Sequence, residues 1–143
     1  MFCVRNTLAA FAILAATMTS VGAQAPEDAV KRDLNHYANI VAGYHIDGRC
    51  GILASSQRAE YYNHILVIER AFLVLGIEAG TLARITERAI AASKSGRYKN
   101  CDAETADAVK QIGVLTQTMG KALGQWLAAN DRTNPGKQKP APK

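Results

Sequence analysis

The chain has 143 residues, 48% of them hydrophobic, and a formal net charge of +5 at pH 7. Much of the positive charge lies near the C-terminus, where residues 131–143 carry four cations against one acid, Asp131. A nucleic-acid-binding domain needs cations clustered on a folded surface, so this pattern argues against a nucleic-acid partner. The sequence also contains no motif for a nucleophilic serine, a P-loop, a dinucleotide fold or haem attachment. We therefore expect no catalytic residues and no cofactor.

Residues 1–23 have the pattern of a cleavable secretory signal peptide. One cation, Arg5, precedes an apolar stretch over residues 8–16, and small residues lead to Ala23. An apolar stretch of about nine residues is too short to span a bilayer, which takes roughly 20. We expect cleavage after Ala23, a mature protein in the periplasm or outside the cell, and no integral membrane segment in that protein. A buried N-terminal helix is the alternative interpretation.

The mature chain starts with a predicted helix from Pro26 to His45. Proline suits the first turn of a helix, and the acids at positions 27 and 28 favour its positive end. Apolar residues recur at helical spacing in this range: Val30, Leu34, Tyr37, Val41 and Tyr44. We expect the pair Asp47-Gly48 to end the helix, because Gly48 can adopt a left-handed conformation.

A second helix is predicted from Ser55 to Leu75, with Gly76 as its C-terminal cap. Its apolar stripe recurs at spacings of four and three residues: Tyr61, Ile65, Ile68, Phe72 and Leu75. Three further apolar residues widen that stripe: Tyr62, Leu66 and Leu73. Because apolar side chains then cover much of the circumference, we expect this helix to be the central and most buried one.

Two more helices follow along the chain. The third is predicted from Glu78 to Ser93 and ends before Ser95-Gly96. Its inward face consists of Leu82, Ile85 and Ala89. The fourth begins after Asp102, a residue type that caps helix N-termini, and its apolar stripe continues until the pattern stops at Asn130.

The fourth predicted helix carries a distinctive surface. Three glycines, Gly113, Gly120 and Gly124, lie beside an apolar stripe that includes Met119, Leu123 and Trp126. Each glycine costs about 1 kcal/mol relative to alanine inside a helix, so their number indicates that another backbone packs closely there. That backbone belongs either to the helix over 55–75 or to another protein. These six residues are therefore the candidate interface for a protein partner or for self-association.

Two cysteines, Cys50 and Cys101, follow the signal peptide. In an exported chain an even number of cysteines favours a disulfide, and two free buried thiols are the alternative. Because strand patterns are absent from the sequence, the expected fold class is all-α, a small bundle of about four helices over 24–130 closed by one disulfide. The prolines and cations of residues 131–143 predict a disordered basic C-terminal tail.

Glu60 and His64 lie one turn apart on the second predicted helix. Such a carboxylate–imidazole pair can share a metal ion or act as an acid–base couple, and a solvated hydrogen-bonded pair is the alternative. The two residues are candidates for a metal site or for the active site of a hydrolase. The two cysteines after the signal peptide, Cys50 and Cys101, have no nearby CxxC motif or paired histidines and fall short of a zinc set, so we expect no bound metal.

Several short motifs can be compared with known sequences. They are Cys50-Gly-Ile-Leu53 opening a helix, Glu69-Arg-Ala71 before Gly76, Thr81-Leu82 followed by Glu87, then Cys101 and Trp126. With these motifs the chain resembles a loose group of uncharacterised exported helical proteins of Gram-negative bacteria, especially alphaproteobacteria. Its two-cysteine helical plan is also similar to that of small periplasmic acid-stress chaperones. The resemblance implies a periplasmic helical protein with a disulfide, and it brings no activity or site residues.

These patterns predict an exported, non-enzymatic helical protein that binds another protein, in envelope stress protection, inhibition or immunity. Two alternatives stay open. One is a metal-binding protein or hydrolase that uses Glu60 and His64. The other is a peripheral membrane-surface protein that uses the cationic tail.

Overall fold

The computed structural model describes residues 27–133, and these residues form an all-α fold. Four α-helices follow one another, with one short 3-10 helix before the last: α1 (Glu27–Cys50), α2 (Ser55–Val74), α3 (Ala79–Ser93), η1 (Gly96–Lys99) and α4 (Ala103–Thr133). The predicted fold class is confirmed. The predicted signal peptide over 1–23 lies outside the described residues, as does the predicted tail from residue 134 onwards.

Alternate helices of the bundle run in the same direction. Between α2 and α4, Glu60 bonds to Gln117 and Arg70 pairs with Asp131, so residue numbers increase together along both helices. Between α1 and α3, Tyr37 bonds to Thr86 and Arg49 bonds to the carbonyl oxygen of Ser93, again in increasing order. The connections are short, which makes each helix antiparallel to the next one along the chain.

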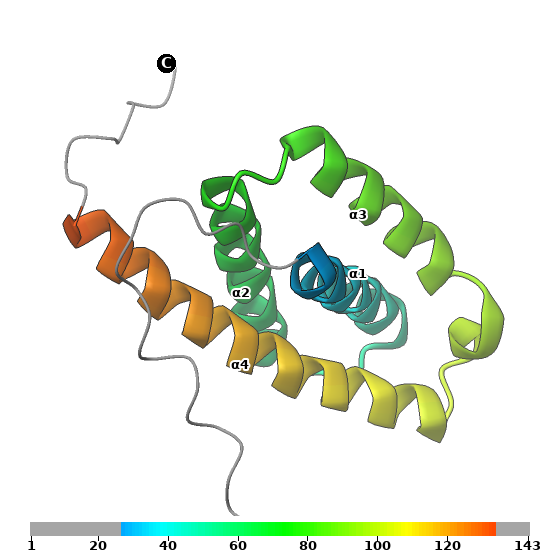
Figure 1. Cartoon of the computed structure of the whole chain (residues 1–143). Helices are drawn as coiled ribbons and strands as arrows, with labels where there is room; N and C mark the ends of the chain where they lie inside the picture. Colours follow the sequence, from blue (N-terminus) through cyan, green and yellow to red (C-terminus); the bar gives the residue numbers. More distant parts are fainter. Residues whose placement is uncertain (1–26, 134–143) are drawn as a thin grey trace, which may run out of the picture.

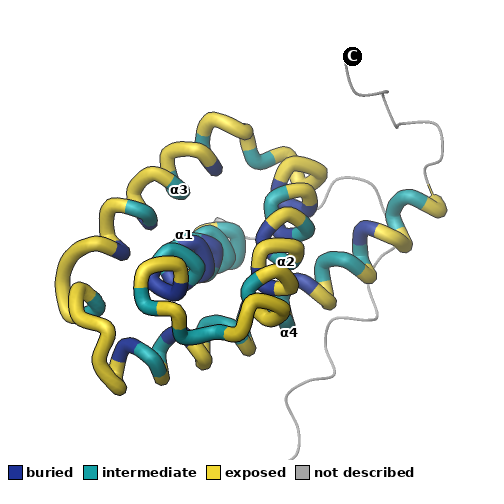
Figure 2. Tube along the Cα trace, turned by 180° about the vertical axis from the view of Figure 1, so that it is seen from behind, coloured by how far each residue is buried: buried dark blue, intermediate teal, exposed yellow. Residues whose placement is uncertain are grey.

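The central helix of the bundle is α1, and the prediction that α2 occupies this place is wrong. Figure 1 shows α1 almost end-on, with α2, α3 and α4 arranged around it. In Figure 2 most residues of α1 are buried or half-buried. By contrast, one side of α2 is exposed along the length of the helix. At Gly43, α1 touches two helices at once, since a Cβ there would lie 2.7 Å from Tyr61 Oη and 3.0 Å from Ile112 Cγ2.

The core forms where α1 meets α2 and α3. Phe72, predicted mid-stripe, is buried and meets the ring of Tyr37 edge-on, with ring centroids 5.8 Å apart. The core cluster comprises Tyr37, Ile40, Val41, Tyr61, Ile65, Ile68, Phe72, Leu82 and Ala89. Burial of these side chains is the main driving force that holds the helices together.

The end of α1 differs from the prediction, because the helix continues through Asp47-Gly48 to Cys50. A Cβ at Gly48 would lie 2.5 Å from Nη2 of Arg58, so a larger residue there would have to displace the end of that side chain. The chain leaves the helix one turn later at Gly51, whose φ of +62° lies in the left-handed region. Gly48 therefore lies beside the end of the Arg58 side chain, whereas a left-handed backbone conformation explains Gly51.

Two other helix boundaries follow the predicted capping chemistry. Gly76 has a φ of +89°, and the amides of Gly76 and Ile77 donate to the carbonyl oxygens of Leu73 and Phe72, which is a Schellman cap. At the start of α4, Oδ1 of Asp102 accepts a hydrogen bond from the amide of Thr105 at 2.9 Å.

The disulfide joins Cys50 to Cys101, as predicted, with their Cα atoms 5.4 Å apart. It links the last residue of α1 to the segment that leads into α4. The helical domain also extends further than the predicted limit of residue 130, because α4 continues to Thr133. Asp131, assigned from the sequence to the tail, instead pairs with Arg70 of α2 at 3.1 Å.

Candidate functional site

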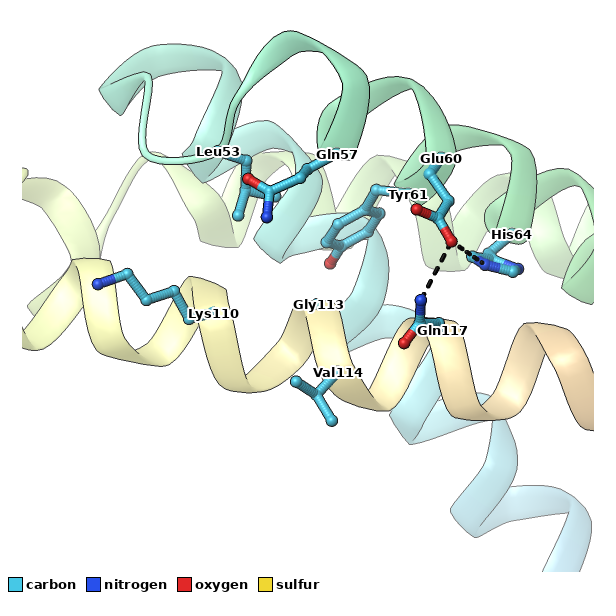
Figure 3. A pocket seen from close by; sticks show the side chains of 9 residues that line it. All are labelled: Leu53, Gln57, Glu60, Tyr61, His64, Lys110, Gly113, Val114 and Gln117. Carbon is cyan, nitrogen blue, oxygen red and sulfur yellow. Dashed lines mark hydrogen bonds and ion pairs between the residues drawn. The ribbon is translucent and has the colours of Figure 1, made fainter.

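A hollow of about 260 Å³ lies between the N-terminal half of α2 and the facing turns of α4 (Figure 3). Its polar side chains come from both helices: Gln57, Glu60 and His64 from α2, and Lys110 and Gln117 from α4. The ring of Tyr61 also lines it, but the Tyr61 hydroxyl donates to the backbone oxygen of Ile40 at 2.8 Å. Burial raises the pKa of Tyr61 to about 12, so this phenol stays neutral and bonded within the bundle.

Glu60 and His64 lie side by side at one end of this hollow, as their spacing predicts. Glu60 Oε1 is 3.5 Å from His64 Nε2, and the side-chain amide of Gln117 donates to the same oxygen at 3.1 Å. The Gln117 amide, and after it the His64 imidazole, hold the pKa of Glu60 below its usual range. Glu60 is therefore an ionised acceptor at neutral pH and a poor proton donor.

His64 is packed between α2 and α4. Its side chain is 16% exposed, and Nε2 is buried with no hydrogen-bond partner among the described residues. The ring occupies the space beside Gly120, where a Cβ would lie 2.6 Å from the imidazole Cγ. Within residues 27–133, no three side chains of the His, Cys, Asp and Glu types gather in a way that could hold a metal ion.

The glycines predicted as a candidate interface all face α2. A Cβ on Gly113 would meet the Tyr61 ring at 3.8 Å, one on Gly124 would meet Val67 at 3.6 Å, and Gly120 touches His64. Two neighbours were considered for these glycines, the helix over 55–75 and another protein. The glycines pack against the first of these, α2.

The three apolar candidates of the same surface are only partly buried. Met119 and Leu123 pack against the core cluster, and Trp126 is half-buried near the end of α4. A role of this surface in binding another protein stays a prediction.

An uncovered apolar face lies instead on α2. Tyr62, Leu66 and Leu73, predicted to widen the buried stripe, are 46%, 45% and 48% exposed. At 100° per residue these three side chains fall within about 40° of one another, and the centre of this group lies roughly 110° from the centre of the buried stripe. We call these three residues the α2 outer stripe. A helical-wheel projection of residues 55–75 contained this signal, but the sequence could not say that no helix covers that side.

Comparison with known proteins brings no family or function to this chain. No protein-family model matches it, and no match was found among curated proteins or among solved structures. What the described residues define is a class by architecture, a four-helix bundle closed by one disulfide.

The length and hydropathy of a helix decide whether it can cross a bilayer. None of the helices between residues 27 and 133 is both long enough and apolar enough to cross a bilayer.

Proposed function

We propose that this chain is an exported, non-enzymatic helical protein that binds another protein in the periplasm or outside the cell, and that it does so through the α2 outer stripe. The observation that carries the proposal is the exposure of Tyr62, Leu66 and Leu73 along one side of a helix. Aligned apolar side chains on a protein surface mark interaction sites, and a tyrosine among them is typical of residues that dominate binding energy.

Two further apolar residues are exposed at the C-terminal end of α2, outside the stripe. Val74 and Leu75 are 50% and 55% exposed there, next to the Schellman cap at Gly76. A partner that lies along α2 would cover the stripe. A helix or an extended segment with apolar residues at matching spacing fits such a surface.

The exported part of the proposal is supported by the disulfide. Disulfides persist in oxidising compartments such as the periplasm and are rare in the cytosol. The secretory pattern of residues 1–23 and the resemblance to exported proteins of Gram-negative bacteria support the same location. Envelope stress protection, inhibition of an enzyme and immunity are the processes in which such a binding protein acts.

The test is capture of proteins from an envelope extract by three forms of the purified chain: wild type, the double variant Leu66→Glu with Leu73→Glu, and Val114→Glu. Val114 is 67% exposed on α4 and serves as a matched apolar-to-acidic control away from the stripe. All three forms should keep the same far-UV circular dichroism, because each replaced side chain is exposed.

We expect the wild type and Val114→Glu to retain the same specific protein and the double variant to lose it. Size-exclusion chromatography with light scattering, run on the same three forms, separates a foreign partner from a second copy of the chain. Capture that is equal for all three forms would refute the stripe as the binding surface.

A further inference from the structure

A second hollow, also of about 260 Å³, lies on the other side of α2, between α2 and α3 and over α1. Figure 1 shows α2 and α3 on either side of α1 at this place. Its walls include the apolar side chains of Leu73, Leu82 and Ala83, and its polar groups are Tyr37, Glu69 and Thr86. Leu73 belongs to the α2 outer stripe as well, so the hollow opens next to the proposed binding surface.

The polar groups of this hollow form an ordered chain of hydrogen bonds. The Tyr37 hydroxyl donates to Glu69 Oε1 at 2.5 Å and lies 2.9 Å from Thr86 Oγ1. A phenol has one hydrogen to give, so Thr86 must donate to the Tyr37 oxygen. Burial of Tyr37, and then its bond to Glu69, raise the pKa of the phenol, which keeps Tyr37 a donor toward the carboxylate.

Glu69 retains unused capacity to accept hydrogen bonds. Within residues 27–133 no Lys, Arg or His side chain forms an ion pair with it, and no donor lies on Oε2. The side chain is half-buried at the polar end of the hollow, so Oε2 can accept a hydrogen bond from a donor that enters it. A carboxylate of this kind at the polar end of an apolar hollow is complementary to a cationic group on an apolar stem.

We infer that this hollow binds the side chain of a lysine carried by the partner protein, with the ammonium group on Glu69 Oε2 and the methylene groups against Leu73, Leu82 and Ala83. The inference rests on the proposed function, because the lysine would belong to the protein bound at the α2 outer stripe. The volume is smaller than the 300–1,000 Å³ or so of pockets for drug-sized ligands, which suits a single side chain.

Lysine fits this site better than arginine. A guanidinium group binds a carboxylate best through two parallel hydrogen bonds, one to each oxygen. In Glu69 one of the two acceptor sites on Oε1 is taken by Tyr37, so Oε2 is the oxygen with both sites free within the described part of the chain. A compact ammonium group with rotatable donors needs no second oxygen.

The experiment titrates the purified protein with three small probes: Nα-acetyl-lysine amide, Nα-acetyl-arginine amide and the uncharged Nα-acetyl-norleucine amide. Binding is followed by two-dimensional NMR on the resonances of Leu73, Ala83 and Thr86. We expect the lysine probe to shift these resonances at lower concentration than either of the others.

Two variants are titrated beside the wild type. Glu69→Gln should weaken binding of the lysine probe by about tenfold or more, because a hydrogen bond to a charged group is lost, while its amide oxygen still accepts from Tyr37. Glu87→Gln, an exposed position on α3, should bind the probe as the wild type does. Equal binding of the lysine and norleucine probes, or no effect of Glu69→Gln, would overturn the inference.

Two further outcomes separate this inference from the proposed function and from binding of the chain's own C-terminal lysines. If the partner from the envelope extract is lost with the Leu66 and Leu73 double variant but kept by Glu69→Gln, the proposed function stands and the lysine site fails. If shortening the chain after Thr133 shifts the resonances of the hollow before any probe is added, the chain's own C-terminal lysines occupy it. That result would overturn the assignment to a partner.

Discussion

Asp47 is a buried carboxylate in the last turn of α1, and three donors converge on it. The backbone amides of Ile52 and Leu53 donate to Oδ1 at 3.0 and 2.7 Å, and Nη1 of Arg58 lies 2.7 Å from Oδ2. One side chain thereby fixes the loop after α1 and the first turns of α2. From the sequence, Asp47 was interpreted only as part of a helix end. The residues next to it in the chain do not show that the following loop and the first turns of α2 donate hydrogen bonds to its carboxylate.

We predict that Asp47→Ala destabilises the fold by about 2–3 kcal/mol. The change leaves two backbone amides and one guanidinium without their acceptor. The loss should fall below the range of about 3–5 kcal/mol for breaking a fully buried pair, because the Arg58 side chain is 33% exposed and can turn to water. Urea unfolding of Asp47→Ala measures the free energy directly.

Asp33→Ala is the matched control for this prediction, since the Asp33 side chain is exposed and, among residues 27–133, pairs only with its neighbour Arg32. It should change the unfolding free energy by less than about 0.5 kcal/mol. Similar stabilities for Asp47→Ala and Asp33→Ala would show that the loop does not depend on this carboxylate.

At the scale of single elements, α2 and α4 meet through glycines that differ in the room beside them. At Gly120 a Cβ would lie 2.6 Å from Cγ and 2.7 Å from Cβ of His64, atoms near the root of that side chain. At Gly124 the nearest atom is Val67 Cγ1 at 3.6 Å, an ordinary van der Waals distance. The same substitution should therefore have opposite effects at the two positions.

We predict that Gly124→Ala stabilises the protein by up to about 1 kcal/mol, the gain in helix propensity. Gly120→Ala should destabilise it, because overpacking costs about 1–3 kcal/mol and outweighs that gain. Thermal unfolding followed by circular dichroism gives both signs. In a His64→Ala background Gly120→Ala should cease to destabilise, and a persistent loss there would show that His64 is not the obstacle.

The apolar pattern of α2 predicts the burial of some of its side chains but not of others. The periodicity of α2 correctly identified Tyr61, Ile65, Ile68 and Phe72 as buried, but the fifth residue of the predicted stripe, Leu75, is 55% exposed at the end of the helix. It could not assign the adjoining apolar residues, because whether Tyr62, Leu66 and Leu73 are covered depends on where α3 and α4 pack. Those two helices leave this side of α2 open, and the candidate binding surface results from that gap.

At the scale of the whole molecule, one covalent bond ties the end of α1 to the start of α4. The two cysteines are 51 positions apart in the sequence, so the bond restricts a long segment of the unfolded chain. The chain-entropy estimate for such a loop is roughly 4 kcal/mol, a large part of the 5–15 kcal/mol or so of a typical domain.

We predict that reduction lowers the melting temperature by roughly 10–20 °C. The measurement is thermal unfolding with and without reductant, and the control is the double variant Cys50→Ser with Cys101→Ser, which reductant should leave unchanged. A wild-type melting temperature that does not respond to complete reduction, verified by a thiol assay, would contradict a stabilising role of the bond.

The features that the sequence by itself determined are those that depend on local chemistry. Helical periodicity, the caps at Gly76 and Asp102, and two cysteines after a predicted signal peptide led to the prediction of four helices and one disulfide, and the structure confirms the helices and the disulfide. Each of these features depends on residues close together in the chain or on simple counting. The close pair of Glu60 and His64 follows from helix geometry in the same way.

Packing between distant segments decided the rest. The central place of α1, the continuation of that helix past Gly48, the contact of Gly120 with His64 and the exposure of the α2 outer stripe each depend on how one helix lies against another. The hollow at Glu69 combines side chains from α1, α2 and α3. A periodic pattern says which face of a helix is apolar, and only the tertiary arrangement decides which apolar faces are covered and which are left exposed.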